Sequence, residues 1–243
     1  MLRLIYICFV SLPFILFYLW KVSYVERHSW KYTENERYKI ARRMVHIMKR
    51  NGFIHTKVYG TENLPTDGGY VMYANHQGKY DSLGIISGHK QPCTIMMDEK
   101  RSHLLLADQF MTLLKGARLD KSSMKTQFHT ILHVISEVKS GRRYIIFPEG
   151  GYYHNKNRVN EFLPGAFKCA IKAQSPIVPV ALIDSYKPFE LNSLKPVTTQ
   201  VHFLKPIYYE EYKELTSKEI SELVRSRIIE TIDFFAFSSC QLD

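Results

Sequence analysis

The chain contains a histidine and a carboxylate whose spacing suits proton transfer. His76 and Asp81 are separated by four residues, and they follow an apolar segment, residues 69–74, that predicts a buried strand. An imidazole can take a proton from a hydroxyl near neutral pH, and a carboxylate bonded to its other nitrogen fixes the tautomer and stabilises the imidazolium. If Asp81 begins the next helix, the loop between them can fold it back onto His76. The pair therefore predicts a general base, with a helix-capping aspartate beside an unrelated histidine as the alternative.

A protein nucleophile is the usual partner of such a pair. Ser82 adjoins Asp81 but is not surrounded by a GxSxG turn, and Cys93 lacks a recognisable nucleophile context. The hydroxyl that loses its proton is therefore expected to belong to a substrate. A lipase-like hydrolase is disfavoured, because it needs an activated serine or cysteine.

A second segment reads as a short buried strand followed by an acidic residue and two glycines. Residues 143–147 are strand-like, and Pro148, Glu149, Gly150 and Gly151 come next. Open α/β folds bind ligands at the carboxyl ends of their strands. Glycine lets the backbone approach a ligand closely or take a positive φ, and glutamate supplies a fixed acceptor. The segment predicts a ligand site, with an ordinary strand-to-turn junction as the alternative.

Together, the segments around His76 and Glu149 resemble the NHxxxxD and FPEG motifs of the glycerolipid acyltransferases, the lysophosphatidate acyltransferase family. The resemblance runs from residue 59 to residue 207 and includes residues 59–65, 162–168 and 176–180 in the order of the family. It implies that His76 and Asp81 are catalytic and that Asn75, Glu149 and Gly150 contribute to substrate binding. It also implies acyl transfer to the free hydroxyl of a lysophospholipid, most simply 1-acyl-sn-glycerol 3-phosphate, giving phosphatidate.

Two departures from the family pattern concern the headgroup of the acceptor. The family usually follows FPEG with Thr-Arg-Ser, whose arginine is associated with the acceptor phosphate, whereas this chain has Tyr152 at that position. The second motif, which commonly ends in Asp-Arg, ends here in Lys121, and lysine lacks the bidentate fork of arginine. The cations expected to bind the phosphate instead are Lys115, Arg118, Lys121 and Arg158. The alternative is an acceptor that is a different lysolipid or a glycolipid.

The expected reaction requires no covalent acyl-enzyme. His76, held by Asp81, removes the proton of the lysolipid hydroxyl, the hydroxyl attacks the thioester carbonyl of a fatty-acyl donor, and backbone amides or a nearby cation stabilise the oxyanion. The donor is expected to be acyl-CoA or acyl carrier protein, because both are acidic and the chain has a net charge of +10. No cofactor and no metal are expected: His129 and His133 stand four apart but lack the glutamate of HExxH and a third ligand.

The N-terminal region predicts a membrane anchor. Residues 4–20 form an apolar run without a charge, which is at the short end of what spans a bilayer, so a short transmembrane helix and a segment embedded in one leaflet are both possible. No small-x-small cleavage site follows, which disfavours a cleaved signal peptide. Nine basic residues occur between positions 21 and 50, against Arg3 alone before the run. The positive-inside rule therefore places the catalytic part on the cytoplasmic face of the membrane.

A basic amphipathic helix is predicted over residues 35–49. It can lie in the headgroup layer of anionic lipid, pack its apolar stripe on the domain, or do both. Basic charge alone would also fit a nucleic-acid-binding module, but such a module should interleave Lys and Arg with exposed aromatic residues. The aromatic residues here lie largely in apolar runs. The predicted anchor therefore favours an anionic membrane surface, and not nucleic acid, as the partner of the basic residues.

The rest of the chain predicts an α/β fold with a mixed or mainly parallel sheet flanked by helices. Strands are predicted at residues 71–73, 94–97, 144–147, 177–183 and 200–204, and every sheet-forming segment is expected after Lys57. An apolar stripe predicts a helix over residues 124–138, and a capping box at residues 216–219 predicts a helix through residue 235. Residues 1–50 are thus expected to form the anchor and basic helix, and residues 51–243 the acyltransferase domain.

Length and cysteine usage agree with one intracellular domain. A chain of 243 residues with an apolar fraction of 45% can fill a single α/β core. Its four cysteines, Cys8, Cys93, Cys169 and Cys240, show no CxxC spacing. This pattern favours reduced thiols and no zinc site.

Overall fold

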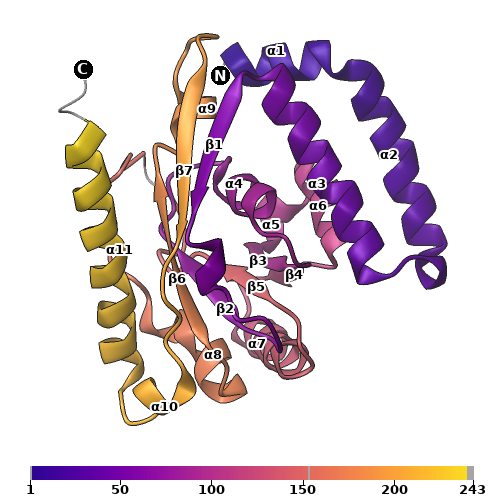
Figure 1. Cartoon of the computed structure of the whole chain (residues 1–243). Coiled ribbons are helices and arrows are strands. Elements are labelled where there is room, and N and C mark those ends of the chain that lie inside the picture. The colour runs from indigo at the N-terminus through magenta and orange to yellow at the C-terminus, as the bar shows by residue number, and fades with distance from the viewer. Residues whose placement is uncertain (1, 153, 240–243) are drawn as a thin grey trace.

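One mixed sheet forms the centre of the computed structural model, which describes residues 2–152 and 154–239 (Figure 1). Its strands are β1 (Ile54–Tyr59), β2 (Val71–Ala74), β3 (Thr94–Asp98), β4 (Ala117–Leu119), β5 (Tyr144–Ile146), β6 (Ile177–Ile183) and β7 (Val197–Phe203). Their order is β1-β7-β6-β2-β5-β3-β4. The five strands from β6 to β4 are parallel, β7 is antiparallel to β6, and β1 is parallel to β7. The predicted mixed, mainly parallel sheet is confirmed.

Both ends of the sheet are strands that the strand pattern did not predict. β1 begins at Ile54, so the expectation that every sheet-forming segment follows Lys57 is wrong. Its residues alternate between buried or half-buried and exposed positions, as expected for an edge strand with one covered face. β4 has only three residues, and it is held by parallel pairing with β3, beginning with Met96 opposite Ala117. A segment this short carries no readable period.

Helices cover both faces of the sheet. Along β2, Met72 and Ala74 point into one core and Val71 and Tyr73 into the other, which is the alternation of a strand buried on both sides. The first core is closed by α3 (Glu34–Asn51), α4 (Asp81–Gly88) and α6 (Ala107–Leu114), and the second by α7 (Met124–Lys139), α8 (Lys168–Ala173) and α11 (Ser217–Ser239). Figure 1 shows α11 and α3 on opposite sides of the sheet.

Local side-chain chemistry sets where the long helices begin. The predicted capping box is confirmed, because Glu219 accepts from the backbone nitrogen of Thr216 at 2.7 Å and Thr216 accepts from that of Glu219 at 3.3 Å. A second capping box, formed by Thr33 and Glu36, opens α3. The shorter helices are α5 (Glu99–Ser102), α9 (Lys187–Glu190) and α10 (Tyr209–Tyr212), with 3-10 turns at Ser29–Lys31, Thr61–Asn63 and Pro164–Phe167.

The apolar N-terminal run forms two helices and not the one helix that its length predicts. α1 (Leu2–Val10) and α2 (Leu12–Arg27) meet at Ser11 with a bend of 74°. Pro13 lies in the first turn of α2, where its missing N–H is tolerated but its ring prevents the helix from running straight through. Among the described helices, none is by itself long and apolar enough to cross a bilayer, whereas the bent pair meets that test by length and composition.

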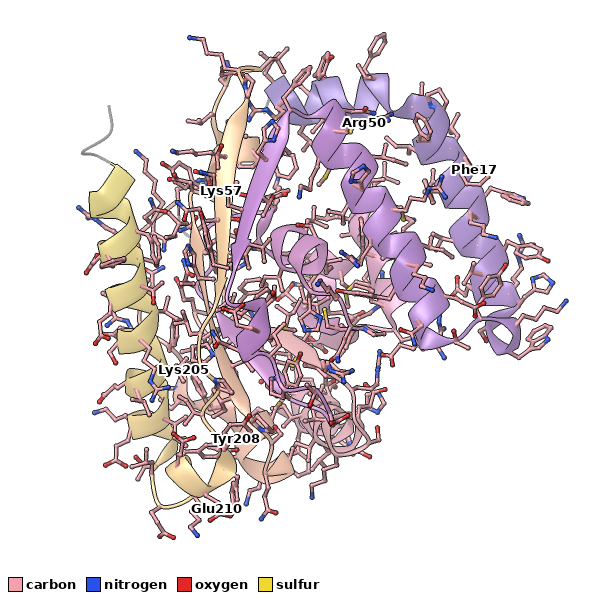
Figure 2. All side chains as sticks on the ribbon, in the orientation of Figure 1. Phe17, Arg50, Lys57, Lys205, Tyr208 and Glu210 are labelled. Atoms are coloured by element: carbon pink, nitrogen blue, oxygen red, sulfur yellow. The ribbon has the colours of Figure 1, made fainter. Side chains whose placement is uncertain are left out.

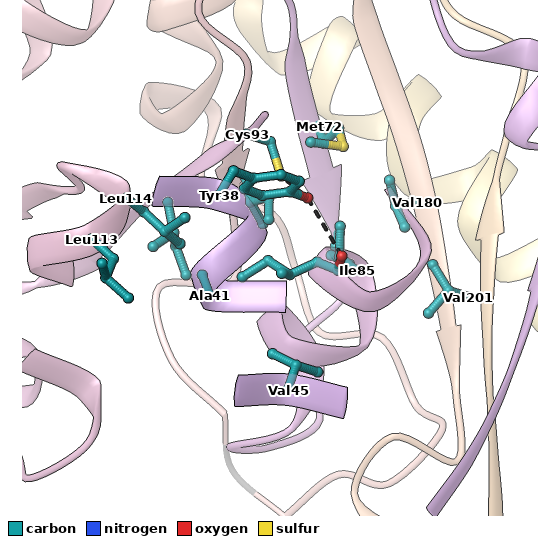
Figure 3. Packing of buried hydrophobic residues seen from close by; sticks show 14 of the residues in the cluster. Tyr38, Ala41, Val45, Met72, Ile85, Cys93, Leu113, Leu114, Val180 and Val201 are labelled. Atoms are coloured by element: carbon teal, nitrogen blue, oxygen red, sulfur yellow. Dashed lines mark hydrogen bonds between the residues drawn. The ribbon is translucent and has the colours of Figure 1, made fainter. Parts of the chain in front are cut away.

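The predicted basic helix exists as α3, and its buried stripe packs on the sheet. Tyr38, Ala41 and Val45 are each almost wholly buried in the same core as Met72 and Val180 (Figure 3). The Tyr38 hydroxyl also donates to the carbonyl of His89 at 3.0 Å, so a polar tip buried in this core is satisfied. The N-terminal helices therefore share their core with the sheet, because Val22 and Val25 of α2 belong to the same cluster.

Candidate active site

The carboxyl ends of the parallel strands meet at one edge of the sheet, and the candidate residues follow those ends. Asn75 comes directly after β2 and is fully buried. Its side chain accepts from the backbone nitrogen of Leu182 at 2.8 Å and donates to the carbonyl of Leu182 at 3.0 Å. Asn75 thus ties the end of β2 to the neighbouring strand β6. Its contacts fix the point from which the next residue, His76, projects.

His76 and Asp81 form the predicted pair. The Nδ1 atom of His76 lies 2.7 Å from Oδ2 of Asp81, and the carboxylate is fully buried while the imidazole remains 16% exposed. The same Oδ2 accepts from the backbone nitrogens of Gln77 at 2.6 Å and Gly78 at 2.9 Å. Asp81 is the first residue of α4 but bonds the loop before the helix. The helix-capping alternative therefore does not describe it.

The contacts of Asp81 decide which imidazole nitrogen can take a proton. Because the carboxylate accepts at Nδ1, that nitrogen carries the hydrogen and Nε2 of His76 is the basic atom. Among the described residues no serine or cysteine bonds to His76. Cys93 is fully enclosed, and burial raises the pKa of its thiol to about 12, so it is no thiolate nucleophile.

Two aromatic rings border the imidazole. Phe147, from the FPEG segment, stacks on it with ring centroids 4.3 Å apart at 20°, and Tyr152 meets it edge-on at 4.9 Å and 75°. Flat stacking on one side and an edge on another restrict the rotation of the ring. The structure therefore brings both motifs together around His76, although they are about seventy residues apart in the chain.

Glu149 holds the backbone of the loop that contains His76. Its Oε1 accepts from the backbone nitrogen of His76 at 2.7 Å, and its Oε2 accepts from Nδ2 of Asn160 at 2.7 Å. Burial raises the pKa of this carboxyl, and the hydrogen bonds from His76 and Asn160 oppose that rise. Both of these contacts of Glu149 are thus made to the protein's own loops.

Gly150 takes a backbone conformation that favours glycine. Its φ is +73°, and a Cβ at this position would lie 2.9 Å from the Leu163 side chain. Its carbonyl accepts from Nζ of Lys121 at 2.7 Å. This contact joins the loop after β4 to the loop after β5, so Lys121 does lie at the active-site edge. The ammonium group is also 3.6 Å from Asp98.

The other predicted cations are placed differently. Arg118 donates to Asp108 at 2.8 Å and to Ser102 at 2.7 Å, so its guanidinium is held within the protein. Arg158 is exposed on the loop after β5, where its backbone nitrogen donates to the carbonyl of Asn155 at 3.0 Å. Lys115 precedes β4 and therefore lies toward the opposite edge of the parallel strands from His76.

Lys115 lines a different hollow. This cavity, of about 330 Å³, lies between α2, α3 and α6, and Arg37 and Val25 also line it. The structure thus leaves Lys115 out of the group of residues around His76. Its backbone at φ +47° ends α6 in a left-handed turn, which is the local reason for its position.

Several residues of the site carry no signal in the motifs. Gln77 is fully buried; it donates to Leu182 at 2.8 Å and to Asn157 at 2.9 Å, and it accepts from the backbone of Ser185 at 2.7 Å. These bonds join the loop after β5 to the loop that contains His76. Only the position of Gln77 inside NHxxxxD could have drawn attention to it.

The exposed guanidinium of Arg101 also lies near the site, 5.2 Å from the centre of the Tyr152 ring.

The chain is similar to proteins that act on lysophosphatidate. The model of the family described as Acyltransferase matches residues 55–183, which is more than half of the chain. A protein of Escherichia coli named 1-acyl-sn-glycerol-3-phosphate acyltransferase is 34% identical over 67% of this chain and 68% of its own length. A yeast protein of the same name, from Saccharomyces cerevisiae, is 28% identical over 82% of this chain.

The chain spans 66% of the length of the yeast protein. Among solved structures, the 1-acyl-sn-glycerophosphate acyltransferase of Thermotoga maritima superposes with a TM-score of 0.76 at 20% identity, covering 96% of this chain and 95% of that one. At this identity the superposition establishes a shared fold.

Proposed function

Because the chain belongs to the acyltransferase family, we propose that it moves a fatty acyl group from a thioester donor to the free hydroxyl of a lysophospholipid. The acceptor is 1-acyl-sn-glycerol 3-phosphate and the product phosphatidate, as the names of the yeast and Escherichia coli relatives suggest. The observation that carries the proposal is the contact of 2.7 Å between His76 and the buried Asp81. It leaves one basic nitrogen in a partly exposed ring and no protein nucleophile beside it in the described residues.

The proton balance of the reaction follows from this geometry. Nε2 of His76 takes the proton of the lysolipid hydroxyl as its oxygen attacks the thioester carbonyl carbon. The imidazolium that forms is stabilised by the carboxylate of Asp81 at Nδ1. When the tetrahedral intermediate collapses, the carbon–sulfur bond breaks and the imidazolium returns its proton to the leaving thiolate. The products are the diacyl lipid and a free thiol, and the enzyme is unchanged.

We also propose that α1 and α2 hold the enzyme in one leaflet of the bilayer. Exposed apolar side chains of this pair include Phe9, Phe17 and Trp20, and Phe17 points away from the rest of the protein in Figure 2. Arg3 is fully buried, and it donates to the carbonyls of Pro188 at 3.2 Å and Lys187 at 3.4 Å. The start of α1 is thereby docked on the catalytic part, which favours the one-leaflet alternative over a spanning helix.

The proposal also covers the acyl donor and the face of the membrane on which the enzyme acts. A net charge of +10 suits acyl-CoA and acyl carrier protein equally, because both are acidic. The basic residues that follow the apolar run support a location of the catalytic part on the cytoplasmic face, beside anionic lipid.

Acyl transfer by the purified full chain tests the proposed function. We expect the protein, in phosphatidylcholine vesicles, to convert 1-acyl-sn-glycerol 3-phosphate and labelled acyl-CoA or acyl carrier protein into labelled phosphatidate. Tyr152, uncharged where the family usually has arginine, favours one second candidate, a neutral lysolipid or a glycolipid acceptor. Faster acylation of such an acceptor than of lysophosphatidate would establish the second candidate. Hydrolysis of the donor without transfer to any lipid would contradict both.

A further inference from the structure

A guanidinium lies one aromatic ring away from the catalytic imidazole. Tyr152 packs edge-on against His76 with ring centroids 4.9 Å apart, and the Cζ atom of Arg101 lies 5.2 Å from the centre of the same tyrosine ring. Arg101 belongs to α5, which follows β3 directly. Because β3 is parallel to β5 and β5 is parallel to β2, α5 lies at the edge of the sheet that carries His76.

Arg101 differs from Arg118 and Lys121 in its acidic partners. Arg118 is paired with Asp108 at 2.8 Å, and Lys121 is 3.6 Å from Asp98. Asp98 accepts a hydrogen bond from the backbone nitrogen of Arg101 at 3.3 Å, and this bond does not involve the guanidinium. Within the part of the chain that the structure describes, the Arg101 side chain makes no ion pair. Its charge is therefore available to a ligand.

Nearby acidic groups do not neutralise Arg101 either. Glu99, on the same short helix, lies 2.8 Å from His103. The guanidinium is exposed to solvent, and its one recorded side-chain contact in the described residues is with the Tyr152 ring. A cation above a tyrosine face is attracted by the ring and keeps its N–H donors free at the rim. The ring thus orients Arg101 without occupying its hydrogen bonds.

We propose that Arg101, oriented by Tyr152, binds the phosphate of the acceptor and so determines which lysolipids the enzyme acylates. This rests on the proposed function, because it assigns the headgroup contact of the same reaction. Guanidinium is the side chain best suited to a phosphate monoester, since its fork matches two phosphate oxygens at once. Tyr152 is then a positioning residue for Arg101 and a neighbour of His76.

The distances allow one acceptor molecule to touch both residues. The two ring contacts place the guanidinium carbon no more than about 10 Å from the centre of the His76 imidazole. In 1-acyl-sn-glycerol 3-phosphate the reacting hydroxyl oxygen and the phosphorus are four bonds apart, about 5 Å at bond lengths near 1.5 Å. Adding a hydrogen bond of about 2.8 Å at each end spans the remaining gap.

The test compares two acceptors that differ only in the phosphate. The purified full chain in phosphatidylcholine vesicles is assayed with 1-acyl-sn-glycerol 3-phosphate and with 1-acylglycerol, as wild type, Arg101→Gln and Arg101→Lys. As a control, Arg43→Gln removes the same charge from an exposed position on α3, a helix that contains none of the residues around His76. We expect Arg101→Gln to raise KM for the phosphorylated acceptor ten- to one-hundred-fold, which is about 1.4 to 2.8 kcal/mol at 1.4 kcal/mol per factor of ten.

The other variants separate charge from position. Arg101→Lys should recover part of the lost affinity for the phosphorylated acceptor. Arg43→Gln should leave KM unchanged for both acceptors. The rates with 1-acylglycerol should be the same in wild type and Arg101→Gln. Tyr152→Leu should raise KM for the phosphorylated acceptor in wild type but add little in Arg101→Gln, because the two residues act as one unit.

Two results would overturn the assignment, and they differ from a failure of the proposed function. An Arg101→Gln enzyme with an unchanged KM for 1-acyl-sn-glycerol 3-phosphate would show that another group binds the phosphate. Equal losses of activity with both acceptors would show that Arg101 stabilises the fold or binds the acyl donor. Failure of the proposed function is recognised separately, because the wild-type enzyme would then not acylate lysophosphatidate at all.

Discussion

Two substitutions of Asp81 should separate its support of the loop from its effect on the imidazole. One carboxylate oxygen accepts from His76 Nδ1 at 2.7 Å and from the backbone nitrogens of Gln77 at 2.6 Å and Gly78 at 2.9 Å. In Asp81→Asn, the amide oxygen can take that position and keep all three donors. In Asp81→Ala, two buried backbone N–H groups lose their acceptor.

The magnitudes differ accordingly. A hydrogen bond to a charged group contributes about 1.5 to 3 kcal/mol, so Asp81→Ala should lower the free energy of unfolding by about 3 to 6 kcal/mol. That is a large part of the roughly 5 to 15 kcal/mol that stabilises a domain. Asp81→Asn should lose only about 1 to 2 kcal/mol, because neutral bonds replace charged ones. Its turnover should nevertheless fall by about 100-fold or more, since no carboxylate faces the imidazolium.

Urea unfolding and steady-state kinetics measure the two effects independently. The unfolding midpoint of each variant gives the change in stability, and kcat at saturating donor and acceptor gives the catalytic loss. If both variants lost the same unfolding free energy, the three-donor arrangement around Asp81 would not support the loop. If Asp81→Asn retained wild-type turnover, the carboxylate would be structural and not part of the base.

Three further outcomes follow from particular contacts. Glu149→Gln should lower kcat and destabilise the protein by about 2 kcal/mol, because one of its two oxygens becomes an NH₂ group facing a donor; unchanged kcat and urea midpoint would show that the carboxylate does not position the catalytic loop. Phe17→Ser with Trp20→Ser should release much of the protein from vesicles in a flotation assay, while the control Leu215→Ser, also exposed, should stay bound; equal binding of both would place the membrane contact elsewhere. Burial lowers the pKa of His89 to about 4, so between about pH 6.5 and pH 4 the unfolded state binds a proton that the folded state does not. The free energy of unfolding should therefore fall by as much as about 3 kcal/mol over that range, and a urea midpoint that rose on acidification would contradict this.

The sequence predicted best where a signal is local. The strand at β6 is predicted with its observed bounds, since a continuous run of seven apolar residues is typical of a strand buried on both faces. The capping box at Thr216 set the start of α11. β1 and β4 were missed because an edge strand with exposed alternate residues and a strand of three residues carry little periodic signal.

In the candidate site, too, the contacts within one short loop could be predicted and those between distant segments could not. The pairing of His76 with Asp81 could be predicted because only four residues separate them, and one short loop decides the geometry. The partners of Lys115 and Arg118 depend on where β4 joins the sheet, which residue spacing does not reveal. Arg101 carries no signal in the sequence, because it follows β3 whereas the ring it contacts, Tyr152, belongs to the loop after β5. Single-residue headgroup contacts of this kind are set by tertiary packing.

The most direct test of the account is the turnover of His76→Ala. His76→Ala removes one of the three donors to the buried Asp81, so its urea midpoint should fall, but the variant should still fold, because Glu149 holds the backbone nitrogen at position 76 and two backbone donors to Asp81 remain. Loss of a general base predicts that kcat falls by about two to four orders of magnitude. His129→Ala, which removes an exposed imidazole from α7, should retain wild-type kcat as the matched control. A folded His76→Ala enzyme that turned over at the wild-type rate would contradict general-base catalysis by this residue.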